Sequence, residues 1–397
     1  MRVLANRIGA SLPAVVFGVA AIATLWALPD LTPAEAIPVV GQETDHGRIV
    51  ESGRIGPTGL PTFVVELGDG TRVDAVVQDA SGGLPGISDR PPYELGDEVV
   101  VTRFSGPAAG ASAVITEPWR VPLLGLAAAL FAAAVLVIGG LRGMRSLVAL
   151  ALTLTVVVRL VIPLLLHGVD PILLAVVAAA GITVFTLLLT EGFSRITLAA
   201  SVGTFVALAM TAGLAALFTA AAEFTALQGN ESIAFLIPIV GERIDLTGIL
   251  LAATVLGSLG VLDDVTVTQA AAVEQLARAE PNATRGGVVA RAMRIGRSHI
   301  AATVNTLVLA YLGASLPLLL LFTLSGQAPL VVLNGEIVAV EVIRALVGSI
   351  GIVAAVPLTT LVAAALLVRG RTGPEPPTDD APAPGRHDPS ETEVGRV

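Results

Sequence analysis

Eight apolar segments divide this chain, and each is long enough to cross a lipid bilayer. A helix needs about 20 apolar residues to span the hydrocarbon core, which is roughly 30 Å thick. Inside that core the backbone has to satisfy its own hydrogen bonds, and a helix does so within one segment. The segments are residues 9–28, 121–140, 147–166, 171–190, 197–219, 246–267, 300–322 and 345–368. The sequence therefore predicts an all-α polytopic transmembrane bundle of about eight spans.

The composition agrees with a membrane protein and excludes several kinds of chemistry. Hydrophobic residues make up 54% of the chain and charged residues 14%, where a soluble domain has about 25% charged residues. The absence of cysteine excludes disulfides, thiol catalysis and thiolate metal sites. The four histidines show no metal-ligand spacing, so we expect no metal and no cofactor. The net charge of −9 argues against nucleic acid as a partner.

The arginines orient the predicted spans, because basic residues concentrate in the cytoplasmic loops of membrane proteins. The opposite short loops hold only Arg243 and Arg344. The arginines that fall on one side are Arg2, Arg7, Arg142, Arg145, Arg195, Arg278, Arg285, Arg291, Arg294, Arg297, Arg369 and Arg371. Both termini are therefore expected in the cytoplasm, and residues 29–120 outside. The first segment also resembles a signal peptide cleaved after Ala34-Glu35-Ala36, but its apolar stretch is long, which favours a retained anchor.

We expect four parts: an N-terminal anchor span (1–28), an extracytoplasmic β domain (29–120), a seven-span bundle (121–368) and a cytoplasmic tail (369–397). The tail is rich in Pro, Asp and Glu, which is typical of disorder. Short β-rich runs in the second part predict five strands of an OB- or SH3-like barrel. They are Arg48–Ser52, Thr62–Leu67, Thr71–Val77, Glu98–Phe104 and Ser112–Thr116, with a hairpin turn at Gly68-Asp69-Gly70. This domain either binds an envelope or membrane-protein partner through residues 40–118 or merely caps the bundle, and we identify no aromatic platform in it.

Two adjacent carboxylates, Asp263 and Asp264, lie inside the sixth apolar segment. A charge in hydrocarbon costs about 2.5–3.5 kcal/mol even on mild insertion scales, so such residues usually line a polar path or relay a proton. Two neighbouring carboxylates do not both ionise easily, which suits a proton carrier. Successive helical residues point about 100° apart, so we expect the two to have different roles.

Four uncharged polar residues are expected near the depth of Asp264. At about 1.5 Å per residue, the positions along their spans place Asn305, Thr306, Thr359 and Thr360 in the same cytoplasmic half of the bilayer. These side chains either complete a proton or ion relay with Asp264 or only join helices by hydrogen bonds.

Arg159 is the other charge expected inside the membrane, roughly 18 Å into the third segment. It neutralises an aspartate such as Asp263 or Asp264, lies along an anion path, or extends its guanidinium towards the interface.

A basic amphipathic helix is predicted over residues 283–299, before the seventh span. Arg291, Arg294 and Arg297 fall on one face, and an apolar face with Val289 and Met293 lies opposite. This pattern is typical of a helix that lies on membrane lipids. The alternatives are a plain connector or a lever that moves with the adjacent spans.

The second half of the chain, from about Leu246 to Val368, resembles the YibE/F family of bacterial multispanning membrane proteins. The residues that carry the resemblance are Gly260-Val261-Leu262-Asp263-Asp264-Val265, Ile295-Gly296-Arg297, Asn305–Gly313, Leu316-Pro317-Leu318, Gly348-Ser349-Ile350-Gly351 and Val356-Pro357-Leu358-Thr359. The resemblance implies a protein of the bacterial plasma membrane whose activity is largely undefined. The last three predicted helices are also distantly similar to SecD and SecF and to resistance-nodulation-division transporters, which implies a proton role for Asp264.

Together these patterns favour a transporter or a proton- or ion-coupled membrane machine that uses Asp264. The alternative is a non-transporting scaffold or accessory protein that acts through its outer β domain. We do not expect an enzyme, because the spans hold neither a metal-ligand cluster nor a Ser/His nucleophile arrangement.

Overall fold

The computed structural model describes residues 2–31, 42–55, 61–77, 93–104, 113–225 and 245–368. The predicted tail, 369–397, lies outside these residues. The chain divides into two compact units, residues 1–192 with 223–253 and residues 193–222 with 254–397, and each is considered by itself.

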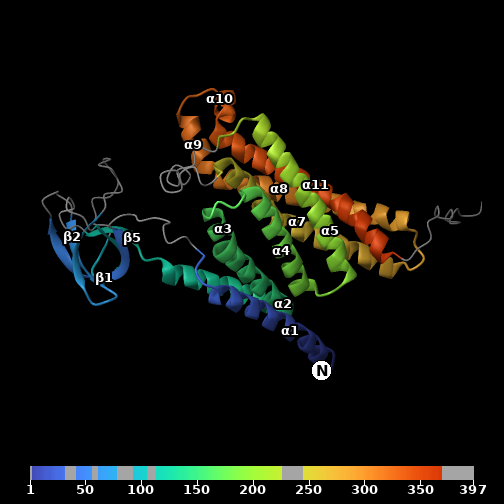
Figure 1. Ribbon diagram of the computed structural model, residues 1–397, viewed down its shortest axis with the longest axis horizontal. Coiled ribbons are helices and arrows are strands. Elements are labelled where there is room, and N and C mark those ends of the chain that lie inside the picture. The colour runs from blue at the N-terminus through green and yellow to red at the C-terminus, as the bar shows by residue number, and fades with distance from the viewer. Residues whose placement is uncertain are drawn as a thin grey trace, which may run out of the picture. The chain divides into compact units, whose positions relative to one another are not determined.

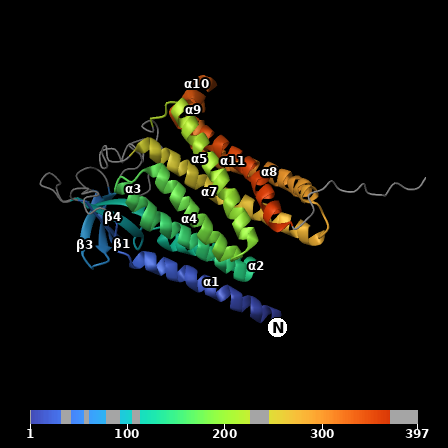
Figure 2. The ribbon, with the colours of Figure 1, turned by 45° about the vertical axis from the view of Figure 1, so that its right-hand side comes forward.

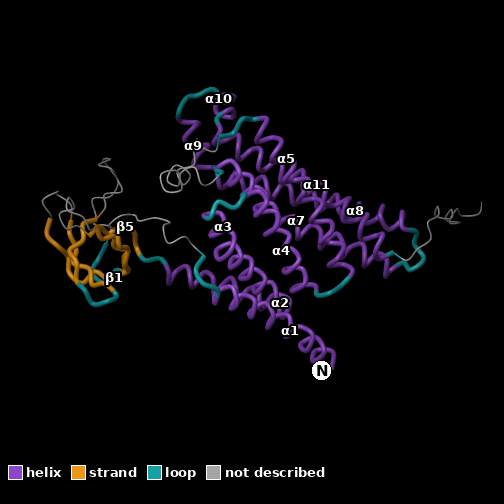
Figure 3. Tube along the Cα trace, viewed as in Figure 1, coloured by secondary structure: helices purple, strands orange, loops and turns teal. Residues whose placement is uncertain are grey.

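A closed five-stranded β-barrel follows the first helix (Figures 1 and 3). Its strand order is β1-β2-β3-β5-β4, with β3 parallel to β5 and the other neighbours antiparallel. This is the arrangement of an OB-fold, one of the two barrels expected. The strands are β1 (Gln42–Ile55), β2 (Pro61–Leu67), β3 (Arg72–Val77), β4 (Glu98–Phe104) and β5 (Ala113–Pro118).

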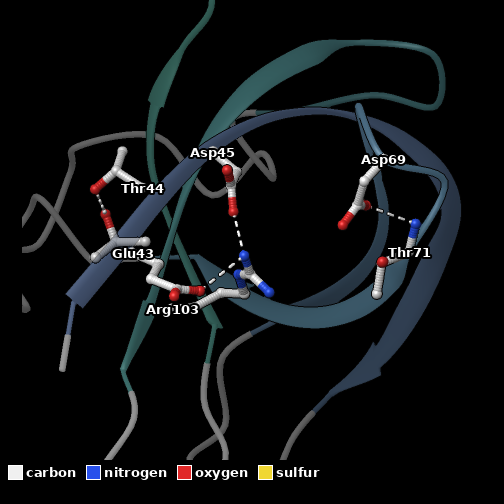
Figure 4. A network of polar contacts seen from close by, with 7 residues as sticks. Glu43, Thr44, Asp45, Asp69, Thr71 and Arg103 are labelled. Carbon is white, nitrogen blue, oxygen red and sulfur yellow. Dashed lines mark hydrogen bonds and ion pairs between the residues drawn. The ribbon is translucent and has the colours of Figure 1, made fainter.

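Alternation along the strands builds the barrel core, because successive side chains of a strand point to opposite faces. Buried core residues include Ile49, Val65, Val101 and Ile115. The predicted hairpin turn between β2 and β3 is confirmed. Gly70 supplies its positive φ of 82°, and the Thr71 amide donates a 2.8 Å hydrogen bond to the Asp69 carboxylate (Figure 4).

Charged side chains join neighbouring strands on the outer surface of the barrel. Figure 4 shows Arg103 of β4 between Glu43 and Asp45 of β1, with which it forms ion pairs. The hydrogen bond from the Thr71 amide lowers the pKa of the Asp69 carboxyl. The side-chain hydrogen bond from Arg48 lowers the pKa of the Glu98 carboxyl.

The helices of the first unit include a sharp reversal at Gly140. This residue has φ 55° and ψ −132°, a conformation that favours glycine. A Cβ on Gly143 would collide with the carbonyl of Val135, whereas in a straight helix these residues lie about 12 Å apart. The helices are α1 (Arg2–Ala27), α2 (Val121–Val156), η1 (Val157–Val161), α3 (Ile162–Leu166) and α4 (Pro171–Glu191). The first arm of α2 thus contains the predicted segment 121–140, and the second arm, continued by η1 and α3, contains the predicted segment 147–166.

The second unit contains α5, most of α7, and α8 to α11. A bend of 57° at the break after Ala314 separates α8 from α9. Helix α7 runs beyond the sixth apolar segment, 246–267, and ends at Ala279. The helices are α5 (Arg195–Ala221), α7 (Leu246–Ala279), α8 (Arg285–Ala314), α9 (Leu316–Leu324), α10 (Pro329–Asn334) and α11 (Glu336–Leu367).

Among the described residues, five helices are long and apolar enough to cross a membrane, or six if α8 and α9 form one bent span. The predicted count of eight is not confirmed. One reason is that α2, η1 and α3 run together from Val121 to Leu166 as one candidate despite the break at Gly140. Another is that the apolar part of α1, Pro13–Ala27, is shorter than the other candidates.

Helices α5 and α11 lie side by side (Figure 2). Each helix places a glycine against a threonine of the other. A Cβ on Gly203 of α5 would collide with the hydroxyl of Thr359 on α11. A Cβ on Gly351 of α11 would likewise collide with the hydroxyl of Thr211 on α5. Small residues are the usual way in which membrane helices bring their backbones close together.

Arginines hold the carboxyl ends of several helices. A helix leaves its last carbonyls without partners inside the helix, and its dipole attracts positive charge there. Arg145 donates to the Thr190 carbonyl at the end of α4, at 3.2 Å. Arg195 and Arg285 donate to the carbonyls of Leu366 and Val368 at the end of α11, at 3.2 and 3.1 Å. These arginines, which the sequence analysis used only for orientation, also cap helices.

Candidate functional site

Helix α7 presents two different faces along its length. Its buried face carries apolar and uncharged polar residues, namely Leu262, Val265, Thr266 and Gln269. Its exposed face carries small or polar residues at a spacing of three or four, namely Gly257, Gly260, Asp264 and Thr268. Asp264 therefore lies outside the packed interior of its unit, one turn from a glycine.

Asp263 and Asp264 have different surroundings, as the angular step between successive helical residues predicts. Asp264 is exposed. Asp263 is half-buried, and its main-chain carbonyl accepts a 3.0 Å hydrogen bond from the Thr266 hydroxyl. Of the two predicted relay carboxylates, Asp264 is the one presented on the exposed face.

The buried polar centre of the second unit is Gln269, which the sequence analysis did not identify. Its side-chain amide donates to the Thr360 hydroxyl at 2.6 Å and to the Ala292 carbonyl at 3.0 Å. Thr360 in turn donates to the Val356 carbonyl at 2.7 Å. Gly296 leaves the necessary space, since a Cβ there would collide with Val356 and lie 2.9 Å from the Gln269 side chain. One amide thus joins α7, α8 and α11.

Buried threonines extend this polar centre towards α5. The hydroxyls of Thr204 on α5 and Thr266 on α7 share a 2.7 Å hydrogen bond, and both residues are fully buried. Thr359 is also fully buried, and its hydroxyl has no hydrogen-bond partner among the described residues. It lies against Gly203. We call Thr204, Thr266, Gln269, Thr359 and Thr360 the polar seam.

The residues predicted to share the depth of Asp264 fall into a buried group and an exposed group in the structure. Thr359 and Thr360 belong to the polar seam, where Thr360 pairs with Gln269 in place of an aspartate. Asn305 and Thr306 are exposed on α8, and the Thr306 hydroxyl donates to the Ala302 carbonyl of its own helix at 3.0 Å. Like Asp264, they lie outside the helix packing.

Within the first unit, Arg159 contacts the residues at and just after the carboxyl end of α1. Its nearest carboxylate is Asp30 at 3.6 Å, and it donates to the Leu28 carbonyl at 2.7 Å. Its guanidinium also lies 5.2 Å from the ring centroid of Trp26. Arg159 thus binds the carboxyl end of α1, and the three roles predicted for it in the membrane stay predictions.

The predicted amphipathic helix, 283–299, is the first half of α8 and runs without a break into the apolar part. The Thr284 hydroxyl caps it by accepting a hydrogen bond from the Gly287 amide at 3.1 Å. Arg294 and Arg297 are exposed, whereas Arg291 is half-buried and forms a 2.9 Å ion pair with Glu280. Two of the three predicted lipid-facing arginines are therefore presented on the surface.

The barrel contains an aromatic pocket that the sequence analysis missed. Its volume is about 390 Å³, and Tyr93, Asp97, Glu98, Pro118 and Trp119 line it. The imidazole of His46 lies against the Trp119 ring at a tilt of 32°, with ring centroids 4.2 Å apart. Burial raises the pKa of the Tyr93 phenol. The two rings that line the pocket, Tyr93 and Trp119, are 26 positions apart in the chain, and the sequence pattern alone does not bring them together.

Comparisons with known proteins place the chain in a family. No curated protein and no solved structure matches it. Similarity to SecD and SecF is not shown. Among the residues that the structure describes, no group of three or more His, Cys, Asp or Glu side chains is arranged to hold a metal ion. The family model described as YibE/F-like protein matches residues 127–369, which include α7, α8, α11 and the polar seam. Because that match covers more than half of the chain, the protein belongs to the YibE/F-like family.

Proposed function

We propose that this protein is a transporter of the bacterial plasma membrane, coupled to protons or another ion, in which Asp264 is the titrating group. The observation that carries the proposal is the position of Asp264 on the exposed, glycine-containing face of α7. If α7 crosses the bilayer, a carboxylate facing lipid costs about 2.5–3.5 kcal/mol or more. A polar path or another protein surface beside Asp264 removes that cost. Gly257 and Gly260 leave room for such a path, because no other atom lies within 3.5 Å of where their Cβ atoms would be.

The polar seam supports this proposal by fixing the rotation of α7 about its axis. Hydrogen bonds from Gln269 and Thr266 hold one face of α7 against α5, α8 and α11. Asp264 then remains on the opposite face. A relay needs a carboxylate whose surroundings change while its scaffold stays in place, and the seam supplies that scaffold.

Eight spans with both termini in the cytoplasm form the topology that we propose. The pairings of helix ends support it within each unit. The arginine-bearing reversal of α2 meets the end of α4 through Arg145, and the starts of α5 and α8 meet the end of α11 through Arg195 and Arg285. The proposed cytoplasmic ends in each unit thus lie together. Counting both arms of α2, the apolar part of α1 and the bent pair α8–α9 then gives eight crossings.

Flux measurements in reconstituted vesicles test the role of Asp264. A pH gradient is imposed, and proton flux is followed with a dye inside the vesicles. We expect Asp264→Asn to abolish flux and Asp264→Glu to restore part of it. Glu274→Gln is the matched control, because it removes a carboxylate from a surface ion pair of the same helix. Flux in Asp264→Asn equal to that of the control would refute the proposal.

A second candidate is a non-transporting accessory protein that acts through its β-barrel. The aromatic pocket of the barrel favours this alternative, since a domain that only caps the bundle needs no such pocket. A cross-linking experiment distinguishes the accessory role from the transport role. It compares the proteins that cross-link to the full chain with those that cross-link to a chain lacking residues 42–118. A specific partner that requires the barrel, together with no flux, favours the accessory role. Neither candidate involves a catalytic step.

A further inference from the structure

The aromatic pocket of the barrel combines two rings with two carboxylates. Tyr93 and Trp119 supply the rings, and Asp97 and Glu98 supply the acids. Aromatic faces attract cations through their quadrupole, and a carboxylate nearby adds a direct charge. Few other ligand types use both features at once, so this chemistry selects an organic cation.

Neighbouring contacts hold the walls of the pocket in place before any ligand arrives. Trp119 continues the sheet through its amide, which donates to the Glu98 carbonyl at 2.8 Å, and the imidazole of His46 lies against its ring. Tyr93 packs edge-on against the core residue Phe63, with ring centroids 6.5 Å apart. Preorganised walls of this kind reduce the entropy lost on binding.

The two carboxylates differ in how far their charge is already balanced. Glu98 accepts a 2.9 Å hydrogen bond from Arg48 and lies 3.5 Å from the His46 imidazole. Asp97 accepts a 2.8 Å hydrogen bond from the Glu94 amide in the turn before β4, and it forms no ion pair within the described residues. Asp97 therefore supplies the unbalanced negative charge of the pocket.

From this geometry we infer that the pocket binds an alkylammonium group, with the cation against Trp119 and Tyr93 and the Asp97 carboxylate balancing its charge. Such a group occurs in small soluble amines and in the headgroups of zwitterionic phospholipids. The inference concerns a site separate from Asp264, so it holds or fails independently of the transport proposal.

The fluorescence of Trp119 reports ligand binding in the pocket. The chain has two tryptophans, so Trp26→Phe leaves Trp119 as the single source of tryptophan fluorescence. In this background the full-length protein, in nanodiscs of phosphatidylglycerol, is titrated with choline chloride at constant ionic strength. We expect a saturable change in Trp119 emission. The neutral analogue 3,3-dimethylbutan-1-ol has nearly the same shape without the charge, and it should give no saturable change.

A matched pair of variants tests the role of Asp97. Asp97→Asn should weaken choline binding about tenfold while its side-chain oxygen still accepts from the Glu94 amide, which preserves the turn. Asp74→Asn makes the same chemical change at an exposed position of β3 away from the pocket, and it should leave the binding midpoint unchanged. Emission spectra without ligand check that both variants retain the barrel.

Two results would overturn the inference: equal binding midpoints in Asp97→Asn and Asp74→Asn, or saturation by the neutral analogue at the same concentrations as choline. A second lipid composition distinguishes the two sources of the ammonium group, a soluble amine and a phospholipid headgroup. Phosphatidylethanolamine in the nanodisc raises the apparent midpoint for choline if a lipid headgroup occupies the pocket. The midpoint stays the same if the natural ligand is a soluble amine.

Discussion

The side-chain amide of Gln269 on α7 donates a 2.6 Å hydrogen bond to the hydroxyl of Thr360 on α11, and both residues are buried. Ninety-one positions separate them in the chain. A buried polar pair of this kind stabilises helix association, because either group buried without the other would lack a hydrogen-bond partner. The bond lies about 12 Å along α11 from Val368, whose carbonyl accepts from Arg285.

Replacing Gln269 by Ala should destabilise the second unit. The substitution removes the hydrogen bonds to Thr360 and to the Ala292 carbonyl and leaves a small void, for a cost of about 1–3 kcal/mol. Thermal unfolding in detergent measures the loss. Gln327→Ala, at an exposed position after α9, serves as the control and should have no measurable effect. Equal melting temperatures for the two variants would contradict the structural role of Gln269.

A second prediction concerns the close approach of α5 and α11. Gly203→Ala places a methyl group against the Thr359 hydroxyl and should cost about 1–3 kcal/mol by forcing the helices apart. Gly213→Ala, on the same helix, meets no atom within 4 Å. It should be neutral or stabilising by up to about 1 kcal/mol, because alanine favours helix over glycine. The comparison fails if Gly213→Ala lowers the melting temperature as much as Gly203→Ala.

The sequence predicted much of the fold because apolar periodicity is a local signal. The helices α4, α5, α7 and α11 cover the predicted spans 171–190, 197–219, 246–267 and 345–368. Strand β1 is longer than predicted, beginning at Gln42 and not at Arg48. Its polar first half pairs residue by residue with β4, and that pairing is a tertiary contact that strand propensity does not contain.

The candidate site was harder to predict, for a physical reason. Asp263 and Asp264 stand out because a charge in an apolar segment is costly wherever the segment folds. Gln269 does not stand out, because an uncharged amide beyond the apolar core resembles a residue in water. Only the positions of α8 and α11 show that it is buried. The aromatic pocket was missed for the same reason, since His46, Tyr93 and Trp119 meet only in the closed barrel.

The barrel should lose stability in acid through Glu98. The Arg48 hydrogen bond holds the folded-state pKa of Glu98 below the ordinary value of 4.5. The pair therefore contributes its full stability above that value and loses it as the pH falls through the folded-state pKa. In the Trp26→Phe background, Trp119 emission follows acid unfolding of the barrel. Glu98→Gln should be less stable than its parent near neutral pH and should equal it once the pH lies below the folded-state pKa of Glu98, where both side chains are neutral. A constant difference at all pH values would contradict this role.

Cysteine labelling in intact cells tests the proposed topology, because the chain contains no cysteine. An impermeant thiol reagent should label Thr71→Cys in the β2–β3 turn and Ser325→Cys after α9. It should not label Ser298→Cys in the first half of α8 until the cells are opened. These three positions are described by the structure, and each lies outside the strands or on an exposed helix face. Labelling at Ser298→Cys in intact cells would reverse the orientation.

The reversal of α2 at Gly140 bears on how the ribosome-bound chain enters the bilayer. A straight helix from Val121 to Leu166 would be about 69 Å long, more than twice the thickness of the hydrocarbon core. Folded back at Gly140, the two apolar arms can partition together as a helical hairpin. In the proposed topology the tip with Arg142 and Arg145 lies on the cytoplasmic side, so no charged loop between the arms has to be translocated. The positive φ of Gly140 thus makes possible two spans, each of a length that fits the hydrocarbon core, in place of one helix that is too long for it.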